Sequence, residues 1–597
     1  MASLCVSTFP TTSLSPLSPL SSKPPPYRFK VSCNASSDDH PKTSESPNLI
    51  LPMQNNNVDR RNLLLGLGGL YGTANMTNIG SAFAYPVTAP DDISDCVPAT
   101  SLINNLDDVV RGVACCPPHS PAAFPKPYVL PSFRALRVRS PAHKLTPEYI
   151  EKYKAAIAAM KALPDDHPHS WKQQGKIHCA YCNGAYHQQL SENQKVEVKV
   201  HFSSIFYPFH RWYLYFYERI LGKLIDDPSF ALPYWNWDNP MGMMLPAMFE
   251  APGPDNDLRT NPLFDPYRNV SHAAPAIVDL QFDDKERGHP CVDQVSINLC
   301  SLHTQMIRTK RTDDFFGCDP NPKVSECGGS IENGAHTAVH RWVGNPRMAN
   351  HEDLGNFYSA GYDPVFYVHH ANVDRMWHIW MGLKGNRNKG PRSTDWKNSS
   401  YVFYDENEEL VRVYNRDCVD MKRMGYMYEA SSIPWKESPP IPRVKASKVA
   451  LKSVRSVKKA EETEFPVKLD KRVNVLVKRP ATTRSEDEKE KATEMLVLNG
   501  IKFNSEKFFK FDVLVNDVDD GIQTTATSSE FVGTFAQVPH MPGHKMFITS
   551  GASYGITEVL EDLEAEEEEY VLVTLVPRAG TEDATVSEIK IELLPID

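Results

Sequence analysis

Seven histidines fall in four short segments of the chain, and their type and spacing suit metal binding. The segments are KIHCAYC with His178, VHFSSIFYPFHRW with His201 and His210, ENGAHTAVHRW with His336 and His340, and DPVFYVHHANVDRMW with His369 and His370. Imidazole binds copper in both oxidation states, whereas hard carboxylate ligands favour other metals. None of the segments has the glutamate of an H-E-x-x-H motif, so this histidine set favours copper over zinc or iron.

The spacing within two of the segments predicts how the rings converge. His336 and His340 are four residues apart, so on a helix they lie on one face and can bind one metal ion. His201 and His210 are nine apart, which on a single helix gives opposite faces. Pro208 favours the first turn of a helix. We therefore expect His201 to precede the helix and His210 to lie just inside it, with both rings directed at one centre.

Cys179 and Cys182 form a C-x-x-C beside His178. This spacing alone is compatible with a zinc knuckle, a redox dithiol or two unrelated structural thiols. Twelve cysteines are too few for a disulfide scaffold in 597 residues but more than a reduced cytosolic enzyme needs. They indicate some exposure to oxidising conditions.

The elements that must position these residues occupy about residues 85–430. A chain of 597 residues exceeds what one core usually supports, so two or more domains are expected. Residues 85–430 are dense in aromatic residues and in helical stretches bounded by proline. Residues 465–597 alternate as strands do and predict a small β-sandwich, in which Asn499-Gly500 is expected to form a hairpin turn.

Residues 431–464 separate these two parts. The stretch from Pro434 to Ala460 is basic, with several prolines at its start, which predicts an exposed linker open to proteases. Its basicity does not indicate nucleic-acid binding, because the whole chain has a formal charge of -10 and no basic face is expected to neutralise phosphates.

The first 84 residues predict targeting signals. Residues 1–37 have no acidic residue and are rich in serine, threonine and proline, as in a plastid transit peptide. Arg60-Arg61, a short apolar run too short to span a bilayer, and Ala82-Phe83-Ala84 then resemble a twin-arginine export signal. This order predicts transport to the thylakoid lumen of the chloroplast, with no integral membrane span.

The motifs IHCAYC, YPFHRWYLYFYE, LPYWNWD, HTAVH and DPVFYVHHANVDRMW closely resemble those of plant polyphenol oxidases, the type-3 copper enzymes that include tyrosinases and catechol oxidases. DWKNSSYVFYDENEELVRV and KFDVLV extend the resemblance along essentially the whole chain. It implies a mainly α core, a four-helix bundle holding two copper ions. It assigns the first ion to His178, His201 and His210 and the second to His336, His340 and His370, leaving His369 as a packing residue.

The resemblance also implies roles for cysteines. It implies a thioether between Cys182 and the His201 ring and two disulfides, which join Cys96 to Cys116 and Cys115 to Cys179. For the remaining cysteines the sequence leaves local pairs open, Cys291 with Cys300 or Cys318 with Cys327.

The implied reaction oxidises an o-diphenol to an o-quinone while dioxygen is reduced to water. By the resemblance Glu332, one turn before His336, orients a water that takes the phenolic proton, and Phe357 is an aromatic gate over the second copper. Thr337 stands where monophenol-hydroxylating relatives often have Asn, and it cannot present an amide oxygen. Arg341 at the mouth is expected to favour substrates with a polar or acidic tail.

The Thr337 and Arg341 pair resembles aurone synthases, the branch that oxidises chalcones, which is the main alternative function. A tyrosinase with monophenolase activity and a haemocyanin-like oxygen carrier are further alternatives. The resemblance also implies that the C-terminal β domain is an inhibitory lid, so that a protease or a detergent activates a latent proenzyme.

Overall fold

The computed structural model describes residues 85–596, except 98–114, 118–123, 192–193, 251–259, 321–326, 384, 386–389, 444–453, 455, 519–522 and 541–545. The chain divides into two units, 1–83 and 84–597, and all described residues belong to the second. The predicted targeting signals of residues 1–84 therefore lie outside the described residues. Among the residues that the structure does describe, no helix is long and apolar enough to cross a membrane.

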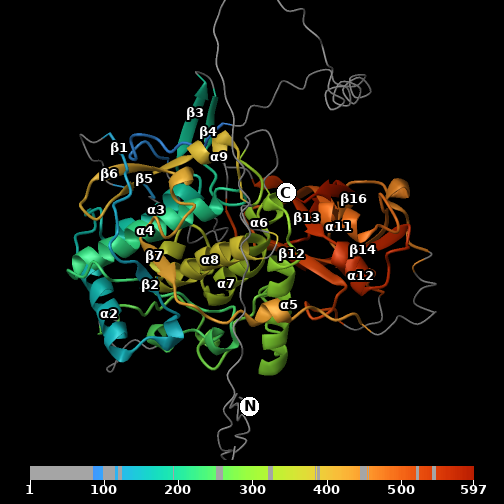
Figure 1. Cartoon of the computed structure of the whole chain (residues 1–597), viewed down its shortest axis with the longest axis horizontal. Coiled ribbons are helices and arrows are strands. Elements are labelled where there is room, and N and C mark those ends of the chain that lie inside the picture. The colour runs from blue at the N-terminus through green and yellow to red at the C-terminus, as the bar shows by residue number, and fades with distance from the viewer. Residues whose placement is uncertain are drawn as a thin grey trace, which may run out of the picture. The chain divides into compact units, whose positions relative to one another are not determined.

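The first part of the described chain is mainly helical (Figure 1). Its α-helices are α2 (Pro147–Lys161), α3 (Trp171–Cys182), α4 (Phe206–Leu224), α5 (Cys291–Met306), α6 (Thr312–Phe316), α7 (Thr337–Val343), α8 (Pro364–Gly382) and α9 (Thr394–Asn398). A single large core of buried aromatic and aliphatic side chains joins these helices. The expected mainly α core is confirmed, with α3, α4, α7 and α8 around its centre.

Side-chain caps fix where the site helices begin. Ser170 accepts a hydrogen bond from the Gln173 N–H at the start of α3. Asp363 accepts one from the Val365 N–H at the start of α8, where Pro364 occupies the first helical position. Such caps satisfy amide groups that have no partner within the helix, and proline costs nothing at that position. These caps set the axial position of the histidines that α3 and α8 carry.

Short strands brace the helices. The sheet β1-β6-β5 joins Lys126–Pro127, Leu410–Tyr414 and Ser400–Tyr404. Strands β2 (Arg137–Arg139) and β7 (Tyr426–Tyr428) pair in parallel, and β3 (His187–Ser191) pairs with β4 (Gln194–Glu197) in a projecting hairpin (Figure 1).

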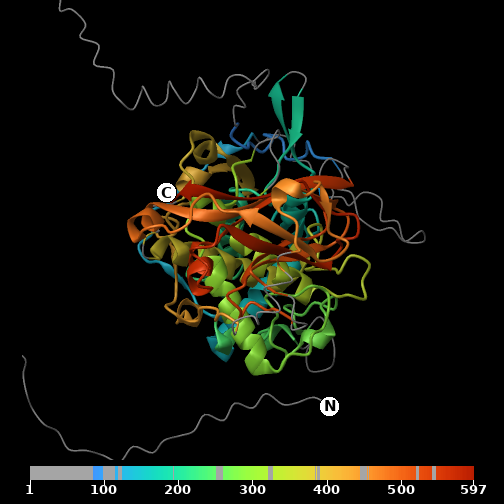
Figure 2. The ribbon, with the colours of Figure 1, turned by 90° about the vertical axis from the view of Figure 1, so that its right-hand side faces the viewer.

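The C-terminal part is a sandwich of two sheets, seen in front of the helical core in Figure 2. One sheet has the order β13-β10-β15-β8 with β16 also paired to β10, and the other has the order β12-β11-β14-β9. The strands are β8 (Val467–Lys468), β9 (Val473–Lys478), β10 (Ala492–Asn504), β11 (Phe509–Val515), β12 (Phe531–Gln537), β13 (Phe547–Gly555), β14 (Tyr570–Ala579), β15 (Thr585–Val586) and β16 (Glu588–Pro595). Helices α11 (Glu486–Lys491) and α12 (Thr557–Asp562) flank them.

The expected hairpin at Asn499-Gly500 is wrong. Strand β10 runs straight through these residues, and its register against β13 shifts between Leu498 and Ile501. Gly500 has a φ of +63°, which glycine adopts without steric cost. The positive φ therefore serves a β-bulge within one long strand instead of a turn between two strands.

The segment 431–464 was expected to be an exposed linker, but both of its ends contact the folded domains. Trp435 is fully buried and its indole donates to Asp238 over 2.9 Å. Arg443 pairs with Asp517 of the β domain at 2.9 Å, and the Leu476 N–H donates to the Lys458 carbonyl. One large aromatic side chain can anchor a segment that is otherwise polar, which overall composition does not reveal.

Three disulfides join residues that the structure describes: Cys96–Cys116, Cys115–Cys179 and Cys318–Cys327. Cys182, Cys300 and Cys418 are buried thiols. A pair between Cys291 and Cys300, left open by the sequence, is therefore absent.

Candidate metal centre

Two groups of side chains with metal-binding atoms lie at the centre of the helical core. His178 of α3, His201 before α4 and His210 in α4 form the first group, together with Cys182. His336, His340, His369 and His370 form the second. Within each group the ligand atoms lie within 4.8 Å of one another and all the side chains are buried. The His210 and His370 rings stack across the two groups at 4.1 Å, so the groups adjoin.

Hydrogen bonds fix the tautomer of five of these histidines. Each uses Nδ1, and each partner is an oxygen that only accepts, so Nδ1 carries the proton. The partners are Phe357 O for His178 (2.8 Å), Glu332 Oε1 for His201 (3.0 Å), Phe206 O for His210 (2.8 Å), Glu332 O for His336 (3.2 Å) and Leu354 O for His340 (2.7 Å). Five Nε2 lone pairs are thereby left for a metal ion, the usual arrangement at metal-binding histidines.

These lone pairs need a cation. His178 Nε2 and His201 Nε2 face each other at 3.3 Å, although neither carries the proton of its neutral ring. Burial lowers the pKa of His178 to about 3 and that of His201 well below its usual value, so neither ring is protonated near neutral pH. Among the described residues, the Nε2 atoms of His210 and His336 have no hydrogen-bond partner. A bound metal ion in each group relieves this electrostatic conflict, so these residues fit the metal.

The structure distinguishes His369 from His370. The Trp237 indole N–H, which only donates, gives its hydrogen bond to His369 Nδ1 at 3.1 Å. The proton of neutral His369 is therefore on Nε2, and its Nδ1 lone pair already accepts the Trp237 hydrogen bond, so neither nitrogen has a free lone pair for a metal ion. His370 Nε2 lies 3.3 Å from His340 Nε2. This geometry supports His370 as the ligand and His369 as the packing residue.

The metal-free protein is expected to lose stability as the pH falls. Burial lowers the pKa of His178 to about 3 and of His340 to about 4, against about 6.5 in an unfolded chain. The unfolded chain then binds more protons, so stability is intact above pH 6.5 and is lost between pH 6.5 and these folded values. At pH 5 each of the two histidines costs about 2 kcal/mol of the free energy of unfolding.

Urea denaturation of copper-stripped protein at pH 7 and pH 5 measures this loss. Copper-loaded protein is the control, because bound metal opposes protonation of the rings. Equal stability of the stripped protein at the two pH values would contradict the neutral, buried histidine centre.

Cys182 lies in the first group as a buried thiol. Burial, followed by the negative charge of Glu332, raises the pKa of this thiol well above its usual value. Without a metal ion, Cys182 is therefore a protonated thiol near neutral pH. Its sulfur lies within 4.8 Å of the ligand nitrogen of His201, close to the ring that the predicted thioether joins.

Glu332 does not stand one regular turn before His336, as the sequence suggested. Residues Glu332–His336 form a π-helical turn, in which Gly334 has non-helical backbone angles. The Glu332 carboxylate accepts the His201 Nδ1–H and the Phe202 N–H (2.8 Å), and so positions the first group. Thr337 donates its hydroxyl to the Glu332 carbonyl at 2.7 Å, which stabilises the turn.

Phe357 and Arg341 also differ from expectation. The Phe357 ring stacks on His201 at 4.2 Å, so it covers the first group and not the second. The Arg341 guanidinium is buried, pairs with Asp284 (Nε to Oδ1, 3.0 Å) and lies over the Phe508 ring of the β domain at 4.6 Å. Arg341 is thus held at the domain interface in this structure, and its charge is already paired.

Several residues that hold the site were not singled out from the sequence. Asp374 of α8 pairs with Arg211 of α4 at 2.5 Å. Asp374 lies one helical turn beyond His370, and Arg211 directly follows His210. Although burial raises the pKa of Asp374, Arg211 and Arg139 lower it further, so the pair is charged. Gln305 of α5 accepts the Ala335 N–H at 3.0 Å and supports the π turn. In the sequence, Arg211 and Asp374 stand out only by lying close to His210 and His370. Gln305 has no such signal.

The β domain covers the side of the first group that Phe357 occupies. The His540 ring lies 5.2 Å from that of Phe202 and 5.4 Å from that of Phe357, and His540 is itself buried. Lys510 donates to the Gln281 and Phe282 carbonyls of the helical domain, the second at 3.4 Å. The structure is therefore a closed arrangement of the two domains.

The fold and the paired histidine groups define the class of protein, a metal-dependent oxidoreductase of the tyrosinase type. The family model for the common central domain of tyrosinase matches residues 168–383. The models for the polyphenol oxidase middle domain and the chloroplastic polyphenol oxidase C-terminal domain match 391–441 and 465–593.

Curated relatives and a solved structure agree. The chain is 43% identical to a chloroplastic polyphenol oxidase of Malus domestica over 98% of both chains, and 43% identical to the chloroplastic (+)-larreatricin hydroxylase of Larrea tridentata over 95% and 94% of the chains. A recombinantly expressed latent aurone synthase (polyphenol oxidase) is 49% identical, with a TM-score of 0.79, and the match covers 86% of this chain and all of that one. This chain belongs to the plant polyphenol oxidase family. It is a polyphenol or catechol oxidase, and the chloroplastic names of its relatives support a chloroplast location.

Proposed function

We propose that this enzyme oxidises o-diphenols to o-quinones with dioxygen, at one copper ion held by His178, His201 and His210 and a second held by His336, His340 and His370. The observation that carries the proposal is the convergence of the histidine Nε2 atoms in two adjoining buried groups, at 3.3 Å between His178 and His201 and between His340 and His370. When bound, copper would supply the electron relay between substrate and dioxygen, with two o-diphenols providing the four electrons that reduce one dioxygen to two waters. A histidine-only ligand set suits copper.

The protein's own groups position the reaction. The Glu332 carboxylate holds His201 and is the candidate acceptor, through a water, for the phenolic proton. Phe357 provides an apolar ring beside the first group, on which an aromatic substrate can stack. Thr337 and Arg341 shape the substrate space indirectly, Thr337 through the turn and Arg341 through Asp284.

We expect fast oxidation of catechols and chalcone-type diphenols, and little attack on tyrosine. The Thr337 hydroxyl is committed to the Glu332 carbonyl and offers no amide oxygen to orient a water for monophenol deprotonation. The test compares 4-methylcatechol, a dihydroxychalcone and tyrosine with activated enzyme, following dioxygen uptake. Thr337→Asn is expected to raise tyrosine oxidation relative to catechol oxidation. Efficient tyrosine oxidation by the unchanged enzyme would overturn the assignment. Faster turnover of the chalcone than of catechols would favour the aurone synthase alternative.

We further propose that Cys182 and His201 are joined by a thioether in the mature enzyme. Bond formation removes the thiol hydrogen and one ring hydrogen, and the oxidising equivalents come from dioxygen at the copper site. After full reduction, the peptide with Cys182 should remain attached to the peptide with His201, at a mass lower by two hydrogen atoms. Mass spectrometry that finds a free Cys182 thiol in active enzyme would refute this bond, and protein prepared without copper is the control.

We also propose that the β domain is a lid and that the enzyme is made as a latent form, activated by a protease in the thylakoid lumen. The contacts of His540 with Phe202 and Phe357 support the lid, because these rings flank the first group. The anchored Trp435 and Arg443 direct cleavage to the chain between Arg443 and Lys458, where the sequence has Lys445, Lys448, Lys452 and Arg455.

A further inference from the structure

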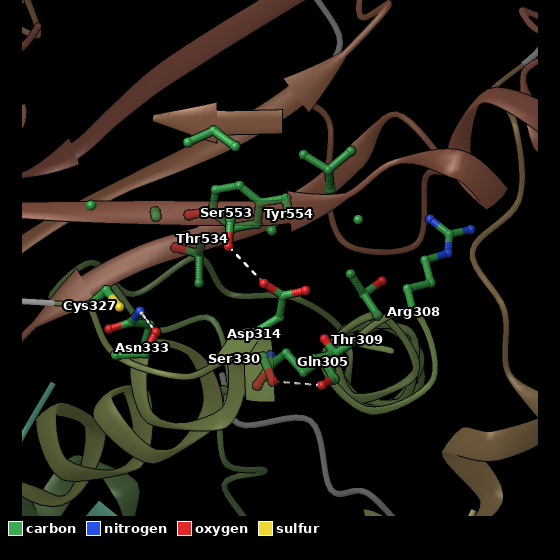
Figure 3. A pocket seen from close by; sticks show the side chains of 18 of the residues that line it. Gln305, Arg308, Thr309, Asp314, Cys327, Ser330, Asn333, Thr534, Ser553 and Tyr554 are labelled. Carbon is green, nitrogen blue, oxygen red and sulfur yellow. Dashed lines mark hydrogen bonds between the residues drawn. The ribbon is translucent and has the colours of Figure 1, made fainter. Parts of the chain in front are cut away.

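The end of helix α5 holds the segment that carries Glu332. Gln305, the last residue but one of α5, binds this segment on both sides of Glu332. Its backbone carbonyl accepts the Ser330 hydroxyl at 2.8 Å (Figure 3), and its side-chain Oε1 accepts the Ala335 N–H at 3.0 Å. The carbonyl is one of those that a helix end leaves without an intrahelical partner. Gln305 therefore fixes the backbone where it enters and where it leaves the turn around Glu332.

The orientation of the Gln305 amide follows from its partners. The Ala335 N–H can only donate, so it faces Oε1, and Nε2 then donates to the Ser301 hydroxyl at 2.8 Å. Ser301 is fully buried and also accepts a hydrogen bond from the Gln281 side chain. Because both polar ends of the Gln305 amide are paired in a buried setting, the side chain is held in one orientation.

The π turn needs such support. Gly334 has a φ of −101° and a ψ of −109°, outside the helical range, and a Cβ at this position would collide with Gln305 Oε1. Gln305 is therefore packed directly against the turn. Non-helical angles within a helix persist only where the surrounding structure holds them. In a regular helix Glu332 would lie one turn before His336, whereas the π turn directs its carboxylate to His201.

We propose that Gln305 is a positioning residue of the first histidine group. By holding the π turn, it keeps the Glu332 carboxylate on two donors, the His201 Nδ1–H at 3.0 Å and the Phe202 N–H at 2.8 Å. An acceptor on the outer nitrogen of a metal-binding histidine orients the ring and raises its basicity. The effect on copper and on diphenol oxidation rests on the proposed function, while the positioning of His201 itself does not.

Hydrogen–deuterium exchange of the full-length chain, prepared with and without copper and resolved to single amides, tests the positioning. Gln305→Met is the main variant, because it keeps the length of the side chain and removes both polar ends. We expect the Phe202 amide of the copper-free chain to exchange about fivefold faster or more, since the turn loses a buried hydrogen bond. A purely local role of Gln305 would speed exchange at Ala335 alone. Ser301→Ala removes only the partner of Nε2, so it should retain the fold and shift Phe202 exchange in the same direction.

Two further variants separate positioning from general stability. Gln294→Met is the matched control, because Gln294 lies three turns earlier on α5, is equally buried and bonds to side chains outside the turn. It should leave Phe202 exchange unchanged. Glu332→Ala removes the carboxylate, and Gln305→Met should then add nothing to its effect on Phe202 exchange. Residues that act through one shared contact are not additive, whereas independent losses of stability are.

Copper affinity and catechol oxidation give the functional readout. After the domains are separated, Gln305→Met should bind the copper ion of the first group about tenfold or more weakly and oxidise catechol more slowly to a similar degree. Gln294→Met should change neither. Faster Phe202 exchange with unchanged copper affinity would overturn the effect on the metal ion and leave the positioning of Glu332.

Unchanged Phe202 exchange in both Gln305→Met and Ser301→Ala would overturn the positioning role. So would effects of Gln305→Met and Glu332→Ala that simply add. A chain that binds no copper would instead refute the proposed function and leave the exchange result in place.

Discussion

His370→Ala is expected to lose one of the two copper ions and to reduce catechol oxidation to the background rate, whereas His369→Ala is expected to keep both ions. The two residues are adjacent, equally buried and of one type, so each variant is the matched control of the other. The difference follows from Trp237, which donates to His369 Nδ1 and so places the proton of that ring on Nε2. His370 Nε2 instead faces His340 Nε2 at 3.3 Å.

His369→Ala should still lower activity, because Trp237 and the second histidine group lose a packing partner. Loss of a residue that supports metal ligands typically costs about 10- to 100-fold in affinity or activity. Copper analysis by mass spectrometry, together with dioxygen uptake on 4-methylcatechol, gives both readouts. Two copper ions in His370→Ala and one in His369→Ala would reverse the assignment of the two histidines.

Cleavage between Arg443 and Lys458, with release of the β domain, is expected to raise catechol oxidation about 10- to 1000-fold. This range corresponds to an open form that makes up about 0.1–10% of the intact chain. The closed form is held by contacts between the domains, among them the bond from the buried Lys510 ammonium to the Gln281 carbonyl and the Arg308–Asp562 pair. Trypsin, or a detergent that separates the domains, should therefore activate the enzyme.

Lys510→Met tests, without cleavage, whether contacts between the domains hold the β domain closed. It leaves the Gln281 and Phe282 carbonyls without their donor, which costs the closed form about 1 kcal/mol or more and raises the open fraction about fivefold or more. Lys502→Met is the matched control, since Lys502 is exposed and lies over Phe547 of its own domain. Equal catechol oxidation by intact and cleaved chains would show that the β domain is not a lid.

Local spacing predicted two features of the histidine groups, whereas their division into two sets of three came from the resemblance to plant polyphenol oxidases. The separation of four positions between His336 and His340, and a proline two positions before His210, are enough to anticipate one metal-binding face and one helix start. Helix α4 does begin at Phe206, after His201 and before His210. The strand alternation of residues 465–597 predicted the β domain for the same reason, since a period of two residues is a local property.

The parts that the sequence did not predict depend on contacts between distant residues. His369 and His370 are distinguished by Trp237, which lies 132 positions from His369. The π turn at Gly334 redirects Glu332 to His201, although regular helical spacing predicted another direction. Gly500 supplies a positive φ that suits both a hairpin turn and a bulge, and only pairing with β13 decides between them.

Copper loading measured against catechol oxidation in one titration is the most direct test of the proposed centre. Metal-free full-length chain is titrated with copper, the domains are then separated by trypsin, and bound copper per chain and dioxygen uptake on 4-methylcatechol are measured at each point. The two adjoining histidine groups predict saturation at two copper ions per chain, with activity appearing only as the second ion binds. Saturation at one ion, or full activity with one ion bound, would contradict a two-copper centre.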